Sequence, residues 1–95
     1  MYASYIEMQL KPGKMSEFME MAKPMEAELG QVDGLKQFIM ADKGNDSSTL
    51  LAIYDTAEAQ EAAGPKAAEL LGRLADLFAA APERKQVEVP INFSF

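Results

Sequence analysis

The residues best placed for chemistry lie where a strand-like run meets the start of a helix. Thr49–Tyr54 has the pattern of a β-strand, and Asp55 to Glu58 follow it directly. Strand ends beside helix N-termini often carry binding groups in small α/β domains. Tyr54 could stack on a flat substrate and donate a hydrogen bond from its phenol. It could equally be a strand aromatic that fills the space between sheet and helix, so both interpretations stay open.

Two carboxylates, Asp55 and Glu58, follow Tyr54 at a spacing of three residues. A carboxylate pair could transfer protons in a reaction. The same spacing is typical of a capping box, in which side chains bond the free N–H groups at a helix start. Capping explains both residues more simply, so we expect Asp55 and Glu58 to begin a helix.

A candidate ligand cleft is predicted from the apolar side chains that Tyr54 would join. Phe38 and Met40 share one face of a predicted strand, and they would line a cleft if that face pointed toward the helices. Clefts lined by aromatic side chains and a few polar groups are the usual small-molecule sites. Ordinary core packing is the other explanation for these side chains and for the seven methionines. The candidate substrate-binding residues are Tyr54, Phe38, Met40, Ile6 and Met19.

The chain contains no histidine and no cysteine. This excludes a Ser-His nucleophile, a disulfide framework and thiol chemistry. The 15 acidic residues are scattered, and Asp42–Asp46 lacks the spacing of a calcium-binding loop. The glycines form no phosphate-binding loop. We therefore expect neither a metal nor a cofactor.

The net charge of −6 argues against a nucleic-acid partner, because no basic stripe would offset the repulsion of a phosphate backbone. The apolar runs are far shorter than the roughly 20 residues that span a bilayer, so we expect no membrane partner. Met1–Leu10 lacks the basic start of a signal peptide. We expect a cytoplasmic protein.

Alternation and helical spacing predict a single domain over residues 1–95. Pro24 lies inside the first predicted helix, which should kink or break near Met21–Lys23. Asp42–Ser48 is predicted to be a polar loop of hairpin character, with Gly44-Asn45-Asp46 at its tip. The predicted strands are Tyr2–Leu10, Leu35–Ala41, Thr49–Tyr54 and Lys85–Ile91. The predicted helices are Lys14–Leu29, Thr56–Ala63 and Pro65–Ala81.

This order is β-α-β-β-α-β, with the second helix in two pieces. It predicts an α+β, ferredoxin-like fold with a four-stranded antiparallel sheet and helices on one face. The other face must then meet water or a partner. The apolar residues Ile91, Phe93 and Phe95 occupy alternate positions up to the C-terminus. A tail exposed to solvent would gain no stability from this pattern. We predict a homodimer in which two sheets face each other and the terminal strand contacts the neighbour. The alternative is a monomer whose tail folds back on its own sheet.

Three segments, in this order and spacing, resemble the antibiotic-biosynthesis monooxygenase family of dimeric α/β barrels. They are Lys11-Pro12-Gly13-Lys14 after the first strand, Val32-Asp33-Gly34-Leu35 at the second, and Tyr54-Asp55-Thr56-Ala57-Glu58-Ala59 after the third. The last looks like the family's Trp-Asp/Glu-Ser-x-Glu-Ala segment. The resemblance covers nearly the whole chain and implies a ferredoxin-like domain that forms a dimeric α/β barrel.

The chain departs from this family where chemistry would be carried. Tyr54 stands where members often have tryptophan, and Ala52 stands where many have glutamate. Many members also have a histidine where this chain has Ala62-Ala63-Gly64. Heme-degrading relatives use an asparagine, a tryptophan and a heme-ligating histidine, and Ile6, Tyr54 and Ala63 or Gly64 match none of them. Without an imidazole for the iron, the resemblance does not extend to heme oxygenation.

The resemblance implies a cofactor-independent monooxygenase that acts on a small aromatic, phenolic or quinone-like molecule. The substrate itself would form an electron-rich anion that reacts with oxygen. The protein would supply a dry pocket and hydrogen-bond donors, and Tyr54 would orient the substrate. The alternative is a non-catalytic dimer that binds a small hydrophobic ligand or serves as an interaction module.

Overall fold

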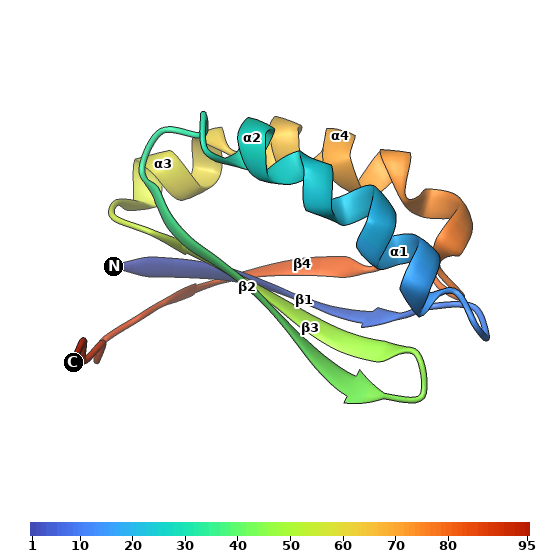
Figure 1. Cartoon of the computed structure of the whole chain (residues 1–95). Coiled ribbons are helices and arrows are strands. Elements are labelled where there is room, and N and C mark those ends of the chain that lie inside the picture. The colour runs from blue at the N-terminus through green and yellow to red at the C-terminus, as the bar shows by residue number, and fades with distance from the viewer.

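The computed structural model describes residues 1–95 and contains one antiparallel sheet. Its strands are β1 (Tyr2–Gln9), β2 (Leu35–Gly44), β3 (Ser47–Tyr54) and β4 (Glu83–Glu88). They lie in the order β2-β3-β1-β4 across the sheet. All the helices cover the same face of this sheet (Figure 1). They are α1 (Met15–Ala22), α2 (Glu26–Leu29), α3 (Ala57–Ala62) and α4 (Gly64–Arg73). This arrangement confirms the predicted α+β, ferredoxin-like fold.

Pro24 divides the first helical segment as predicted. α1 ends at Ala22, a single 3-10 turn, η1 (Lys23–Met25), contains the proline, and α2 follows it. Proline has no N–H to donate, so the α-helical hydrogen-bond ladder is interrupted there. Phe18 before Pro24 and Met25 directly after it are both buried. The break therefore keeps apolar residues on both sides of the proline over the sheet.

The predicted hairpin and its tip near Asn45-Asp46 are confirmed, but the polar loop predicted over Asp42–Ser48 is too long at both ends. Only Asn45 and Asp46 separate the strands, and their φ angles are 54° and 61°. Two successive residues with positive φ form the turn whose twist matches that of paired strands. The polar residues on either side of this turn therefore belong to the paired strands, with Asp42 opposite Ser48.

The last helix is shorter than its apolar spacing predicts. α4 ends at Arg73, a 3-10 turn η2 (Ala75–Leu77) follows, and Phe78 is extended with ψ 136°. The backbone leaves the helix to pair with the end of β1. The N–H of Lys11 donates to the carbonyl of Leu77, and the N–H of Ala79 donates to that of Gln9, both at 2.8 Å. The prediction of a helix to Ala81 was wrong because these strand-like bonds compete with the helical ones.

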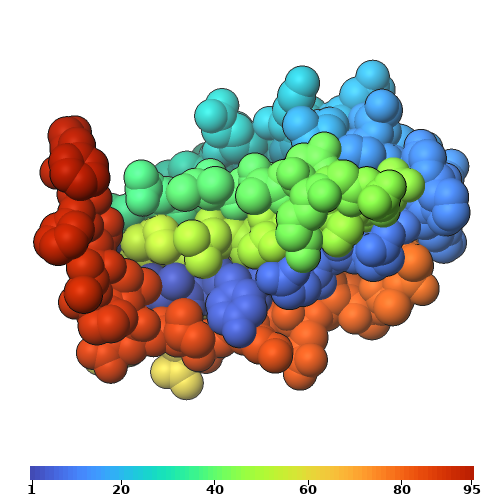
Figure 2. Space-filling view, turned by 90° about the horizontal axis from the view of Figure 1, so that it is seen from below, coloured from blue at the N-terminus to red at the C-terminus, as the bar shows by residue number.

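The C-terminal tail, residues 89–95, is not part of the sheet. β4 ends at Glu88, and one further backbone bond joins Val89 to Met1. Pro90 offers no N–H with which to continue the ladder. The tail stands away from the domain (Figures 1 and 2), and Ile91 and Phe93 are 69% and 77% exposed. The predicted extension of the strand to Ile91 was therefore wrong, and the tail does not fold back on its own sheet.

The main core lies between the inner face of the sheet and the helices. Alternate residues of β1 point inward, so Ile6 and Met8 are buried while Glu7 and Gln9 are exposed. Phe18 from α1 meets Phe78 edge to face, with ring centroids 6.3 Å apart. None of the helices is long and apolar enough to cross a membrane.

Candidate functional site

Strand register brings the inward-facing side chains of three strands together. Ser4 on β1 lies opposite Ala52 on β3, and Ala52 lies opposite Phe38 on β2. Leu50 is likewise paired with Ile6 on one side and Met40 on the other. Directly paired residues point to the same face of a sheet. These side chains therefore form a continuous floor beneath the helices.

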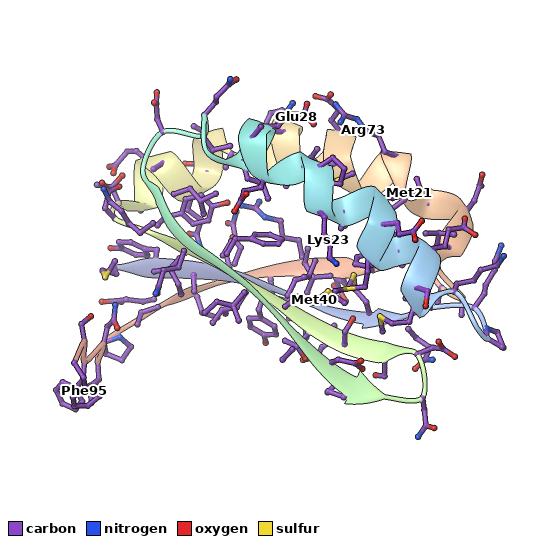
Figure 3. All side chains as sticks on the ribbon, viewed as in Figure 1. Met21, Lys23, Glu28, Met40, Arg73 and Phe95 are labelled. Atoms are coloured by element: carbon purple, nitrogen blue, oxygen red, sulfur yellow. The ribbon has the colours of Figure 1, made fainter.

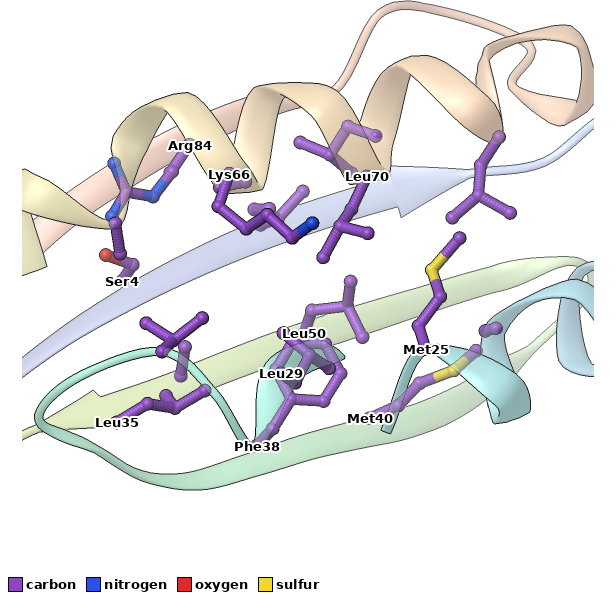
Figure 4. Close-up of a pocket in the computed structure, with 18 of the residues that line it drawn as sticks. Ser4, Met25, Leu29, Leu35, Phe38, Met40, Leu50, Lys66, Leu70 and Arg84 are labelled. Atoms are coloured by element: carbon purple, nitrogen blue, oxygen red, sulfur yellow. The ribbon is translucent and has the colours of Figure 1, made fainter. Parts of the chain in front are cut away.

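A cavity of about 100 Å³ lies between this floor and the helices (Figure 4). Of the 20 residues that line it, 17 are hydrophobic. Phe18, Met25 and Leu29 form one side of the roof, and Ala67 and Leu70 from α4 form the other. The side chains thus leave open space above the sheet, as a ligand site requires.

The structure brings four of the five predicted site residues to this cavity. Tyr54, Phe38, Met40 and Ile6 all lie on its wall. Met19 instead lines a neighbouring groove between the first helical segment and β2, and it is 37% exposed. Phe38 and Met40 border both the cavity and the groove. Phe38 is 46% exposed, so it stands at the boundary between the two spaces.

The volume of the cavity bounds the size of a ligand. A cavity needs roughly 10–15 Å³ to hold a single water molecule. An apolar cavity of about 150 Å³ holds benzene and otherwise stays dry. A cavity of about 100 Å³ therefore approaches the size that one ring needs. Met25 and Met40 lie together at one end of it (Figure 4), and methionine side chains adapt readily to a ligand. The site suits one small ring better than a fused ring system.

Three polar residues that the sequence analysis did not select also border the cavity: Ser4, Lys66 and Arg84. Ser4 lies on the predicted inner face of the first strand. Lys66 and Arg84 carry charges that are usually found at surfaces. Arg84 also lies one residue before Lys85, where the last strand was predicted to begin. The strand pattern therefore did not predict which face of the sheet Arg84 would occupy. The pairing of Arg84 with Ile6 turns its side chain inward.

The charge of Lys66 is compensated outside the cavity. Its Nζ lies 2.9 Å from Glu28 Oε1, and Arg73 also bonds Glu28 in a bidentate pair. Glu28 and Arg73 lie close together on the side of the helices away from the sheet (Figure 3). The hydrogen bonds from Arg73 and Lys66 lower the pKa of Glu28 to about 2. The bond to Glu28 in turn raises the pKa of Lys66. This network ties α2 to α4 over the roof.

The two carboxylates after Tyr54 lie outside the cavity. Thr56 is the N-cap of α3, and its Oγ1 accepts a hydrogen bond from the N–H of Ala59 at 3.0 Å. Asp55 lies 3.8 Å from Lys36 in an exposed ion pair. A cap does begin the helix at this point, but Thr56 provides it rather than Asp55.

Solved structures share this fold over nearly the whole chain. A protein of unknown function from Nitrosomonas europaea is 16% identical, with a TM-score of 0.83 over 98% of this chain and 92% of its own. A putative antibiotic biosynthesis monooxygenase from the same organism is 17% identical, with a TM-score of 0.79 over 96% of this chain and 100% of its own. The resemblance seen in the sequence is therefore confirmed for the fold.

The same fold also occurs in a porphyrin-binding protein. A point mutant of MhuD, solved with two manganese protoporphyrin IX molecules per active site, is 17% identical, and its TM-score is 0.76 over the full length of both chains. This chain offers no histidine to an iron, and its cavity is small for a porphyrin. No family model and no curated protein matches the sequence.

Proposed function

We propose that this protein is a cofactor-independent monooxygenase that acts on a small aromatic or quinone-like molecule held in the cavity. The observation that carries the proposal is an apolar cavity with Tyr54 on its wall. Tyr54 is only 4% exposed, so most of its aromatic ring is shielded from bulk water. The fold it shares with structures named antibiotic biosynthesis monooxygenases supports the proposal.

The proposed reaction draws its electrons from the substrate. A hydroquinone anion transfers electrons to dioxygen, one oxygen atom enters the ring, and the other leaves as water. The product is a hydroxyquinone. The protein excludes water from the reacting anion and stabilises its charge with a hydrogen bond. Tyr54 is the donor we assign to this role, because it can pack against the ring and bond its oxygen.

Oxygen uptake tests this proposal. Hydroquinone with the wild-type protein should consume oxygen above the uncatalysed rate, and Tyr54→Phe should lower kcat/KM roughly tenfold to a hundredfold through loss of the donor. Tyr2→Phe is the matched control, because Tyr2 lies opposite Tyr54 on β1 but outside the cavity wall. An oxygen electrode measures both rates.

Unchanged uptake in Tyr54→Phe and Tyr54→Ala would remove Tyr54 from the reaction. If the wild-type protein consumed no oxygen above the uncatalysed rate, the proposed monooxygenase activity would be ruled out. If ring ligands then still bound, the second function would apply, which is non-catalytic binding of a small hydrophobic ligand. Ala52 and Ala63 favour that alternative, since neither adds a polar group to the cavity wall.

The proposed functional unit is a homodimer. Ile39 and Val87 lie on the sheet face opposite the helices and are 45% and 42% exposed. Phe93 is 77% exposed, and Phe95 at the end of the tail holds its ring away from the domain (Figure 3). A second copy would bury both apolar regions in one isologous contact.

Sedimentation velocity tests the dimer. We expect the wild-type chain to sediment as a dimer at micromolar concentration, and a Phe93→Ser/Phe95→Ser double variant to shift toward monomer. Glu17→Ser on the exposed side of α1 is the control and should remain dimeric. A wild-type monomer at these concentrations would contradict the proposal.

A further inference from the structure

We propose that Ser4 and Arg84 form an anion-binding corner of the cavity, so that its ligand is a small aromatic ring bearing a negatively charged oxygen. The inference rests on the proposed role of the cavity as the ligand site and specifies the chemistry of that ligand. It is independent of whether the ligand is oxidised.

The first observation is an unpaired hydroxyl at the cavity wall. Ser4 Oγ is fully buried and has no hydrogen-bond partner, and the residue is only 4% exposed. Buried polar atoms in native proteins are nearly always paired, so an orphan needs an explanation. A ligand oxygen in the cavity would accept the hydrogen bond that the free protein leaves unmade.

The second observation is a cation without an anion. Arg84 is partly buried, and none of the ion pairs in the structure includes it. Its Nη2 donates to the carbonyl of Gln60 at 2.9 Å, which uses one of the five N–H donors of a guanidinium. Lys66, the other cation at the cavity, already has Glu28. Arg84 therefore supplies the uncompensated charge.

The position of Arg84 is fixed by its neighbours rather than left to solvent. Gln60, whose carbonyl accepts from Arg84, donates from its own side chain to the carbonyl of Ala3 at 2.6 Å and is buried. Arg84 Nη1 also lies beside Gly64, the first residue of α4. A held guanidinium loses less conformational entropy when it binds an anion.

The two groups lie at the same end of the cavity. Ser4 pairs with Gln86 and Ile6 pairs with Arg84, so Ser4 and Arg84 are diagonal neighbours on the inner face. Tyr54 is the diagonal neighbour of Ser4 on the other side, because Ser4 pairs with Ala52. Figure 4 shows Ser4 and Arg84 together, with Met25 and Met40 at the opposite end. Donors thus gather at one end and apolar side chains at the other.

This arrangement selects one ligand class. Arginine and serine together present hydrogen-bond donors and a positive charge, which suit a carboxylate or a phenolate oxygen. The remaining wall suits an aromatic ring, and the volume limits that ring to a small one. The protein's own charge of −6 repels anions at a distance, so an anion that binds needs such a local partner.

NMR titrations with defined probes test the proposal. Benzoate and 4-nitrophenolate carry the anion as a carboxylate and a phenolate, and benzamide and nitrobenzene are neutral rings of similar shape. The wild-type protein should bind at least one anion roughly tenfold or more tightly than its neutral counterpart. Arg84→Gln should weaken anion binding roughly tenfold to a hundredfold and leave neutral rings unaffected. Lys11→Gln removes an equal charge from an exposed turn and should change neither.

Ser4→Ala provides a second test with effects of opposite sign. Removing the unpaired hydroxyl should raise the melting temperature of the free protein, yet weaken binding of the anion several-fold. Ser48→Ala is the matched control, because Ser48 Oγ is the other buried unpaired hydroxyl but lies outside the cavity wall. That variant should also raise the melting temperature but leave anion binding unchanged.

Several outcomes would overturn the proposal: no probe binds, anions and neutral rings bind equally, or Arg84→Gln and Ser4→Ala bind anions like their controls. Arg84→Lys, which keeps the charge but loses the planar fork, should fall between wild type and Arg84→Gln. Hydroquinone turnover without anion binding would overturn this inference alone. Anion binding through Arg84 without oxygen uptake would overturn the monooxygenase alone.

Discussion

Gly34→Ala is expected to lower the free energy of unfolding by about 2–5 kcal/mol, the sum of a backbone cost and a packing cost. Gly34 has a φ of +78°, which L side chains rarely adopt, and an added Cβ would lie 2.5 Å from Ala59 Cβ and 2.6 Å from Asp55 Oδ1. The carbonyl of Gly34 also accepts the N–H of Asp55 at 3.0 Å. The substitution would therefore push apart the turn before β2 and the segment that follows Tyr54.

Gly44→Ala separates the two costs. Gly44 has a φ of +84°, but nothing lies within 4 Å of an added Cβ. The Gly44→Ala variant should therefore lose only the backbone cost, about 1–2 kcal/mol of unfolding free energy. Urea denaturation of both variants gives the comparison. Equal losses of unfolding free energy in the two variants would show that Ala59 and Asp55 move aside at little cost. That result would contradict the close packing of Gly34 against these residues.

Phe18→Ala is expected to cost about 3–5 kcal/mol, a large part of the roughly 5–15 kcal/mol that stabilises a domain of this kind. Phe18 is only 1% exposed and packs edge to face on Phe78. Its side chain also lines the cavity, so its removal would join new empty space to the existing volume. The lost contacts and the larger void both destabilise the protein.

Phe38→Ala is the matched control for Phe18→Ala. The same atoms are removed from a side chain that is 46% exposed at the boundary of the cavity. Its expected cost is about 1 kcal/mol, because only part of its apolar surface is buried. Thermal unfolding followed by circular dichroism measures both variants. Similar losses in the two would contradict the assignment of Phe18 to the core and Phe38 to the boundary.

The order of elements could be predicted because each strand and helix has its own residue spacing. The helix break at Pro24 followed from chemistry local to one residue. The end of α4 did not, because Leu74, Leu77 and Phe78 continue the helical spacing of apolar residues. Phe78 leaves the helix to bridge Leu10, which is 68 residues away in the sequence. A periodicity within one segment carries no information about such a distant partner.

The site was predictable to the extent that strand alternation determines it. Tyr54, Phe38, Met40 and Ile6 reach one cavity because their strands pair in register. Met19 follows Phe18 on a helix, where each residue turns by about 100°, so it faces the neighbouring groove instead.

The polar end of the cavity depends on pairing that the sequence does not display. Arg84 turns inward only because its strand begins earlier than alternation predicted and pairs it with Ile6. Ser4 stood on the predicted inner face, but the absence of any partner for its hydroxyl requires the packed structure. Whether a charge is compensated, as for Lys66, is likewise decided by contacts between distant segments.

The central claim is that the cavity between the sheet and the helices is a ligand site. Its most direct test is the location of the amide shifts when the wild-type protein is titrated with benzoate. The account predicts saturable shifts centred on Ser4, Ala52 and Ala63 around the cavity, with little change at Lys43 on the far face or Phe93 in the tail. Shifts confined to the far face or the tail, or none at saturating benzoate, would contradict it.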